Sequence, residues 1–190
     1  MILTNAILSQ FSSGDDALSP VTLRPWSLGE HSYATNGKIL VRVDRLADVA
    51  PPVDRKIEQT TAQIDGWLAK LAAAHRVPVP RIEVPAGKSW TCDQCEGRGC
   101  SCCECDGAGK WHQPVRVSWR GVHISRDLWL MIAALPGGTI AASPPLPPIY
   151  DHVSFAFDGG SGIVMPMRKP TIPQDVEPLI VDAEPGAQAA

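Results

Sequence analysis

The chain lacks any run of residues long and apolar enough to span a membrane, which takes about 20 mostly apolar residues. Residues 1–11 also lack the basic region and long apolar run of a secretory signal. Only 19% of residues are charged and the net charge is -3, which argues against a surface that binds nucleic acid all over. We therefore expect a cytoplasmic protein that does not contact membranes.

Cysteine is absent outside residues 92–105, where all 6 cysteines lie. In a reducing compartment, clustered cysteines are typical of metal sites rather than of disulfides. This segment contains two near-copies of one short unit, Cys92-x-x-Cys95-x-Gly97-x-Gly99 and Cys102-x-x-Cys105-x-Gly107-x-Gly109. Each unit resembles the cysteine-rich repeats of DnaJ-type chaperones. The His-Pro-Asp tripeptide of their J domain is absent here, so the resemblance does not imply chaperone function.

The two units predict one structural Zn²⁺, because zinc takes four tetrahedral ligands and thiolates suit it. A thioredoxin-like redox pair would start a helix, which so glycine-rich a segment does not form. Spacing alone leaves open whether Cys100 or Cys103 replaces Cys102. Because protein thiolates would fill every coordination position, the site is expected to be structural rather than catalytic. The predicted ligands are Cys92, Cys95, Cys102 and Cys105.

Hydrophobic periodicity and turn residues predict an α+β fold. Helices are expected at residues 2–12, 54–75 and 125–135, hairpins at 31–43, 114–125 and 152–167, and an edge strand at 20–28. Asn36-Gly37 predicts a tight turn with positive φ at both residues. In the strand after it, Ile39, Val41 and Val43 share one face, whereas Leu40 and Arg42 share the other.

The helix at residues 54–75 has the clearest pattern in the chain. Asp54 is its expected N-cap, and Pro78 lies beyond its end. One face carries Ile57, Ile64, Leu68 and Leu71, so we expect this face to pack on the rest of the protein. Residues 158–162 (DGGSG) are interpreted as a hairpin turn, and residues 169–190 as a mostly disordered tail.

Three segments resemble the bacterial replicative sliding clamp. Residues 32–40 are similar to its Ala-Thr-Asp-Gly-His-Arg-Leu hairpin, residues 163–168 to its Val-Met-Pro-Met-Arg ending, and residues 123–140 to its strand, capped helix, Leu-Pro and strand. The resemblance implies one clamp-like domain, two helices on an antiparallel sheet, of the kind phages or prophages encode. The implied divisions are a first part of that domain (1–47), an inserted helix and linker (48–87), a zinc ribbon (88–112), a second part (113–168) and the tail (169–190).

In sliding clamps, the glycine hairpin of one domain and the Met-Pro-Met-Arg end of its neighbour form a pocket for short peptides. Here both elements lie in one domain, so an equivalent pocket is expected to need two copies meeting head to tail, or not to form. Asn36 replaces the usual Asp, and Ile39 replaces an Arg, which removes a polar contact. The positions that match the pocket are Thr35, Gly37, Lys38, Leu40, Met165, Pro166, Met167 and Arg168.

Sliding clamps line their ring with basic helices, which attract phosphates without reading sequence. The first helix here has no basic residue, and a solvated basic hairpin edge explains the remaining cations equally well. The candidate DNA-binding residues are Lys110, Arg116, Arg120 and Arg126. Trp90 and Trp111 bracket the cysteines, and either pack on the zinc turns or, with nearby cations, bind single-stranded nucleic acid.

The histidines are scattered and show no readable pairing with an acid or a nucleophile, so we predict no catalytic residues. The sequence predicts a non-enzymatic, zinc-binding accessory or interaction protein linked to DNA replication. Its expected partners are replication proteins or DNA, with a homo-oligomer as a further expectation. The alternative is a zinc-ribbon nucleic-acid-binding protein whose clamp-like frame serves only as scaffold.

Overall fold

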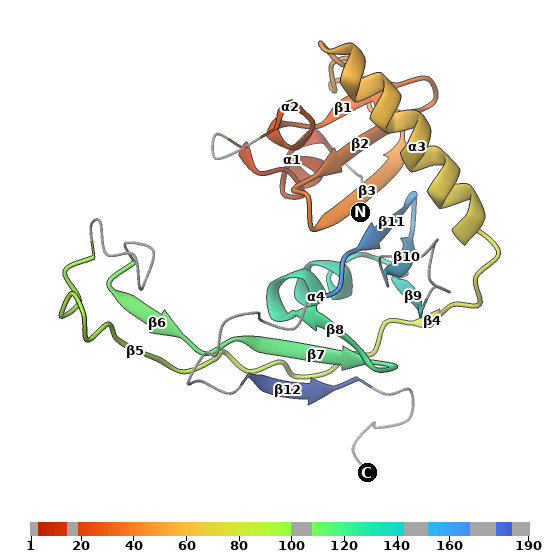
Figure 1. The fold of residues 1–190 in the computed structure, drawn as a ribbon. Coiled ribbons are helices and arrows are strands. Elements are labelled where there is room, and N and C mark those ends of the chain that lie inside the picture. Colours follow the sequence, from red (N-terminus) through yellow and green to blue (C-terminus); the bar gives the residue numbers. More distant parts are fainter. Residues whose placement is uncertain (1–3, 15–18, 100–107, 143–151, 168–177, 184–190) are drawn as a thin grey trace.

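The computed structural model describes residues 4–14, 19–99, 108–142, 152–167 and 178–183. It has an α+β fold with mostly antiparallel strands, which agrees with the predicted fold class (Figure 1). The described helices are α1 (Asn5–Ser9), α2 (Pro20–Leu23), α3 (Arg55–Leu71) and α4 (Arg126–Ala133).

The largest element is a 7-stranded sheet in the order β1-β2-β3-β11-β10-β9-β4, with every neighbouring pair antiparallel. The first three strands in this order precede α3 in the sequence, whereas β11, β10 and β9 come from the later part of the chain. The two groups meet in the centre of the sheet, where β3 pairs with β11. The strands are β1 (Trp26–Leu28), β2 (His31–Thr35), β3 (Ile39–Asp44), β4 (Val77–Pro78), β9 (Thr139–Ala142), β10 (Val153–Phe157) and β11 (Gly160–Val164).

The two faces of this sheet bury different side chains, as the alternation in β3 predicted. Ile39, Val41 and Val43 are buried in a core that also holds side chains from the end of α1 and from α4. Leu40 points to the opposite face, where it packs with residues of α3. Helix α3 therefore covers one face of the sheet, and α1 and α4 lie on the other.

The β2–β3 hairpin forms at the predicted place with a different turn. Only Gly37 has positive φ, at 81°, so the predicted pair of positive-φ residues is wrong. Asn36 is accommodated instead because its Oδ1 accepts hydrogen bonds from the backbone N–H groups of Lys38 and Ile39, each at 3.0 Å. This side-chain capping closes the loop without a second left-handed residue.

The predicted DGGSG turn is shorter than expected. Residues 158 and 159 make the turn, whereas Gly160 and Gly162 lie inside β11, paired with Phe157 and Phe155 of β10. A Cβ at Gly162 would meet the ring of Phe155, and one at Gly160 would meet the ring of Phe157. These glycines are therefore required because the rings of the neighbouring strand lie across them.

A separate 3-stranded sheet, β12-β7-β8, is built from β7 (Val115–Trp119), β8 (Val122–Ser125) and β12 (Leu179–Asp182). The β7–β8 hairpin turns at Arg120 and Gly121, which both have positive φ. β12 pairs in parallel with β7, and Leu179 and Val181 pack against the main core. The prediction of a disordered tail is therefore wrong for residues 178–183, because a strand forms there and packs every second side chain on an apolar surface.

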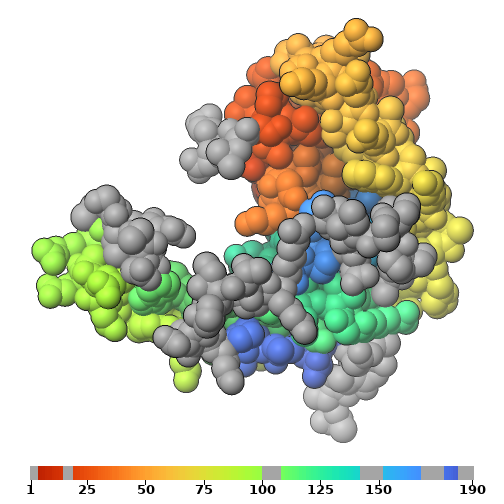
Figure 2. All heavy atoms as spheres, in the orientation of Figure 1, coloured from red at the N-terminus to blue at the C-terminus, as the bar shows by residue number. Residues whose placement is uncertain are grey.

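Strands β5 (Ser89–Thr91) and β6 (Lys110–His112) form a 2-stranded ribbon of their own. We call residues 88–99 and 108–113 the finger, and the rest of the described chain the body. Figure 1 shows the ribbon away from the larger sheet, and Figure 2 shows the finger projecting from the body as a lobe.

Two local predictions are corrected by the structure. Residues 20–23 form a short helix rather than a strand, with Pro20 at its first position, and the strand begins only at Trp26. Helices α1, α3 and α4 form at the predicted places, but each is shorter than predicted. Asp54 does cap α3, since its carboxylate accepts a hydrogen bond from the Lys56 backbone N–H at 2.8 Å.

Candidate functional site

A cavity in the described part of the chain lies between α3 and the strands β3 and β11. We call it the α3 pocket, and it encloses about 380 Å³, within the range of small-molecule and peptide-anchor sites. Its lining comes from Val21 of α2, the β2–β3 hairpin, α3, His152 just before β10, and the end of β11. The lining residues are Val21, Thr35, Gly37, Lys38, Ile39, Leu40, Thr60, Ile64, Trp67, Lys70, His152, Ile163 and Met165.

Apolar side chains dominate the α3 pocket. Ile64 and Ile163 are buried at its floor. Trp67 is 42% exposed and Met165 is 45% exposed, although both are large apolar residues. A folded chain normally covers such side chains, and grouped exposure beside a cavity is characteristic of a binding surface.

The two hydroxyl groups in the lining already have hydrogen-bond partners. Thr35 Oγ1 donates to the Ile39 carbonyl at 2.7 Å and accepts from the Gly37 N–H at 3.0 Å. Thr60 Oγ1 donates to the Lys56 carbonyl, one helical turn earlier, at 2.8 Å. These hydroxyls therefore shape the pocket walls and are poorly placed to activate a substrate.

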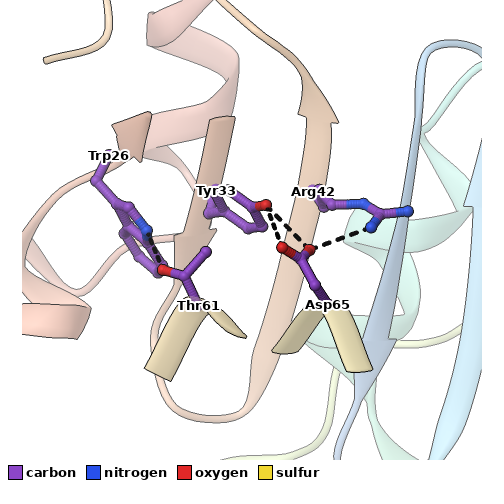
Figure 3. Close-up of polar contacts among 5 residues, drawn as sticks. All are labelled: Trp26, Tyr33, Arg42, Thr61 and Asp65. Atoms are coloured by element: carbon purple, nitrogen blue, oxygen red, sulfur yellow. Dashed lines mark hydrogen bonds and ion pairs between the residues drawn. The ribbon is translucent and has the colours of Figure 1, made fainter. Parts of the chain in front are cut away.

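Helix α3 is fixed to the sheet by polar contacts as well as by its apolar face (Figure 3). The Trp26 indole N–H donates to Thr61 Oγ1 at 2.9 Å in a buried contact. The Tyr33 hydroxyl donates to both carboxylate oxygens of Asp65 at 3.0 Å, and Arg42 pairs with the same carboxylate at 3.2 Å. These contacts fix the position of α3 over β1–β3, so the pocket is already formed without a ligand.

The phenol of Tyr33 is strongly perturbed by this arrangement. Burial raises the pKa of Tyr33 well above its ordinary value, and the hydrogen bond to Asp65 and that residue's negative charge raise it further. The positive charge of Arg42 acts in the opposite direction. The tyrosine consequently stays protonated and keeps donating its hydrogen bond to α3 across the physiological range.

The structure brings together most of the residues that the sliding-clamp resemblance singled out. Thr35, Gly37, Lys38, Leu40 and Met165 all line the α3 pocket. The Met165 N–H donates to the Lys38 carbonyl at 2.8 Å, which joins the two motifs directly. Pro166 and Met167 do not line the pocket, since the chain there crosses to β8, where the Met167 N–H donates to the His123 carbonyl. Arg168 lies outside the described residues.

A single chain forms the α3 pocket, and α3 supplies one of its walls. The expectation that an equivalent of the sliding-clamp pocket needs two copies, or does not form, stays a prediction. Sequence reasoning therefore missed the α3 residues Thr60, Ile64, Trp67 and Lys70 as pocket residues. Trp67 was the available signal, since a tryptophan off the apolar stripe of an amphipathic helix is an unusual surface residue.

The first half of the predicted zinc site forms a compact turn in the finger. Cys92 and Cys95 are buried, and Trp111 packs against them. After Cys95 the chain turns sharply through positive φ at Glu96, Gly97 and Gly99. Such a turn lets two thiols of a Cys-x-x-Cys pair face one ion, so the described half fits the chemistry of a zinc site.

The two repeat units lie against each other at their glycines. The Cys92 N–H donates to the Gly109 carbonyl at 3.0 Å. A Cβ at Gly109 would lie 2.5 Å from the Gly97 carbonyl oxygen, so the segment at Gly109 does not tolerate a side chain there. Cys102 and Cys105, like Cys100 and Cys103, lie outside the described residues, and within those residues no three metal-binding side chains gather. The full zinc ligand set stays a prediction.

The tryptophans that bracket the cysteines have different environments. Trp90 and Trp111 pair across the ribbon, but Trp111 is partly buried against the thiols whereas Trp90 is 36% exposed. Of the two tryptophans, only Trp111 therefore packs on the cysteine turn.

The four candidate DNA-binding cations do not gather into one exposed surface. Lys110 is exposed on the finger, and Arg120 is exposed with its guanidinium 5.4 Å from the Trp119 ring centroid. Arg116 is only 7% exposed. Arg126 is half-buried, and its Nε donates to the Pro85 carbonyl at 2.9 Å. Two of the four are thus occupied inside the fold.

No family model, curated protein or solved structure matches the chain. The resemblance to sliding clamps therefore remains a prediction from short motifs. No helix in the described ranges has the length and apolar character needed to cross a membrane.

Proposed function

We propose that this protein is a non-enzymatic interaction protein whose α3 pocket receives a short apolar segment of a partner protein. The observation that carries this proposal is the exposure of Trp67 and Met165 at the mouth of a pocket with a buried apolar floor. Aromatic and methionine side chains are enriched at the centres of protein interfaces. The pocket is large enough to take one or two apolar side chains of such a segment.

Two features favour docking over catalysis. The described lining contains the titratable side chains of His152, Lys38 and Lys70 but no carboxylate and no thiol, so neither a carboxylate–histidine pair nor a thiol–histidine pair lies within it. The walls are held rigidly by the Trp26–Thr61 contact and the Tyr33–Asp65–Arg42 cluster. A rigid, preformed apolar pocket lowers the entropy cost of docking a segment.

The finger adds a zinc-stabilised structural element in this proposal, with Zn²⁺ bound by Cys92, Cys95, Cys102 and Cys105. The sliding-clamp resemblance makes replication proteins the first class of partner to test. The pocket forms within one chain, so docking does not depend on a homo-oligomer.

A second candidate function rests on the finger. Trp90 is exposed on the ribbon, with Lys88 and Lys110 exposed nearby in sequence and register, which suits stacking on a single-stranded nucleic acid. Arg98 is also exposed on the finger, where its guanidinium lies 3.6 Å from the Glu96 carboxylate.

One pair of variants tests both functions, the first by peptide selection and the second by oligonucleotide binding. A random 12-residue peptide library displayed on phage is selected on the purified protein, and the enriched peptides are then measured on two variants. Trp67→Glu places a charge at the pocket mouth, whereas Trp90→Glu makes the same change on the finger. We expect enriched peptides to lose binding to W67E and to keep it on W90E.

An absence of enriched peptides, or peptides that bind W67E as well as the native chain, would overturn the docking proposal. Binding of single-stranded oligonucleotides that is lost in W90E, steep in salt and unaffected by W67E would support the second function. Circular dichroism melts of both variants confirm that each still folds.

A further inference from the structure

The α3 pocket carries an unbalanced positive charge. Its lining among the described residues includes two charged side chains, Lys38 and Lys70, and both are exposed. Neither makes an ion pair or a side-chain hydrogen bond within those residues, where the ion pairs are Arg42–Asp65, Arg98–Glu96 and Arg126–Asp127. Asp65 of α3 does not line the pocket, and its carboxylate is already shared by Tyr33 and Arg42.

The two lysines come from separate parts of the chain. Lys38 lies in the β2–β3 turn, and its backbone is fixed on both sides. Its N–H donates to Asn36 Oδ1 at 3.0 Å, and its carbonyl accepts from Met165. Lys70 lies in the last turn of α3. The pocket therefore has a cation on its sheet wall and another on its helix wall.

Helix capping does not account for Lys70. A lysine in the last helical turn is often explained by the negative end of the helix dipole. In α3, however, Arg76 fills that role, since its guanidinium donates to the Leu71 carbonyl at 2.8 Å and to the Ala72 carbonyl at 3.4 Å. The side chain of Lys70 can therefore interact with a ligand in the pocket.

We propose that the partner segment carries an Asp or Glu side chain next to its apolar anchor, and that Lys38 and Lys70 select it. This inference rests on the proposed docking function and specifies the chemistry of the partner. Low-dielectric walls beside two like charges concentrate their field, so a carboxylate is attracted to the mouth while the apolar side chain fills the floor. An apolar segment flanked by Lys or Arg would instead be repelled, which gives the pocket specificity.

The same phage-displayed library tests this inference. Each peptide is joined to the coat protein through its C-terminus, so its only carboxylates are those of its side chains. We expect enriched peptides to carry Asp or Glu within two positions of a Leu, Ile, Met, Phe or Trp. Replacing that acid by its amide should weaken binding to the native chain by about 3- to 10-fold, the range for partly exposed charge pairs. Salt at about 1 M, where the Debye length is about 3 Å, should remove most of this difference.

A double-mutant cycle assigns the effect to the two lysines. The variant Lys38→Gln with Lys70→Gln should weaken the acidic peptide by about the same factor and leave the amide peptide unchanged. Lys56→Gln, an exposed lysine on α3 that does not line the pocket, is the matched control and should change neither.

The outcomes separate this inference from the docking proposal. Peptides that depend on Trp67 but show no acidic preference, or that bind the double variant as well as the native chain, overturn the inference and leave docking intact. If no peptide depends on Trp67, docking itself fails.

Discussion

The body and the finger of this protein are stabilised by different means. In the body, α3 buries Ile57, Ile64, Leu68 and Leu71 against the sheet, and buried side-chain hydrogen bonds add to this packing. In the finger, the buried apolar cluster consists of Cys92 and Cys95 with Trp111 packed against them, and the three residues of β5 are all exposed.

This difference indicates which region can fold on its own interactions. Hydrophobic burial contributes about 25 cal/mol per Å² of apolar area, so a ribbon with so small a core gains little from it. An isolated two-stranded hairpin is marginally stable at best in water. The described part of the finger therefore gains little stability from its own packing, and the proposed Zn²⁺ would supply more.

Loss of the proposed Zn²⁺ should have the largest effect, and this effect should be confined to the finger. Structural zinc contributes about 10–16 kcal/mol to zinc-finger peptides, far more than the finger core can supply. We expect one Zn²⁺ per chain in reduced protein by elemental analysis, and fast amide exchange of residues 89–99 after EDTA treatment, with the exchange of β3 and α3 unchanged. Cys92→Ser should reproduce this result, whereas Ser89→Ala on the same ribbon should not.

The same assay identifies the remaining ligands. Cys102→Ser and Cys105→Ser should release the metal, while Cys100→Ser and Cys103→Ser should retain it. If the reduced protein contains no metal and EDTA does not change the amide exchange of the finger, the proposal that a metal stabilises the finger is wrong.

Truncating the apolar face of α3 should destabilise the body alone. Ile64 is 2% exposed, and Ile64→Ala is expected to lower the free energy of unfolding by about 2–5 kcal/mol through lost burial and a residual cavity. Gln63→Ala, at an exposed position of the same helix, should change it by less than about 0.5 kcal/mol. Urea unfolding measures both, and zinc content should stay constant throughout.

Stability of the body should fall at high pH because of Tyr33. The folded-state pKa of its phenol is raised above the ordinary value of 10.0, so the unfolded chain loses this proton first as the pH increases. The stabilisation is complete below pH 10 and should decline above it by about 1.4 kcal/mol per pH unit.

Tyr33→Phe should remove this slope, at a cost of about 1 kcal/mol at neutral pH for the lost hydrogen bond to Asp65. Tyr150→Phe, which removes the other tyrosine hydroxyl in the sequence, is the control. Urea unfolding between pH 8 and 11 measures the slope, and an unchanged slope in Y33F would contradict this assignment.

The smallest expected effect has the opposite sign. Gly66 lies within α3, is exposed, and has open space where a Cβ would be. Gly66→Ala should therefore stabilise the body by about 0.5–1 kcal/mol, because alanine loses less backbone entropy in a helix. A thermal melt detects the increase, and finger exchange should not respond to it.

Local patterns predicted much of this fold. The amphipathic face of α3, its Asp54 cap, the alternation along β3 and the positions of the three hairpins follow from spacings of two and 3.6 residues and from turn residues. Such signals are local, because each depends on a few neighbouring residues. They failed at Gly160 and Gly162, where the need for glycine comes from aromatic rings on the next strand.

The sequence by itself determined the local features: the paired cysteine units, the turn at Thr35–Lys38 and the motif that includes Met165. Only the tertiary structure decided that the last two meet α3 and form one pocket with Trp67 and Lys70 in its wall. It also decided that Arg116 is buried and that residues 179–182 complete a sheet. The reason is physical, since periodicity fixes which face of an element is apolar, whereas long-range packing selects the surface that this face covers.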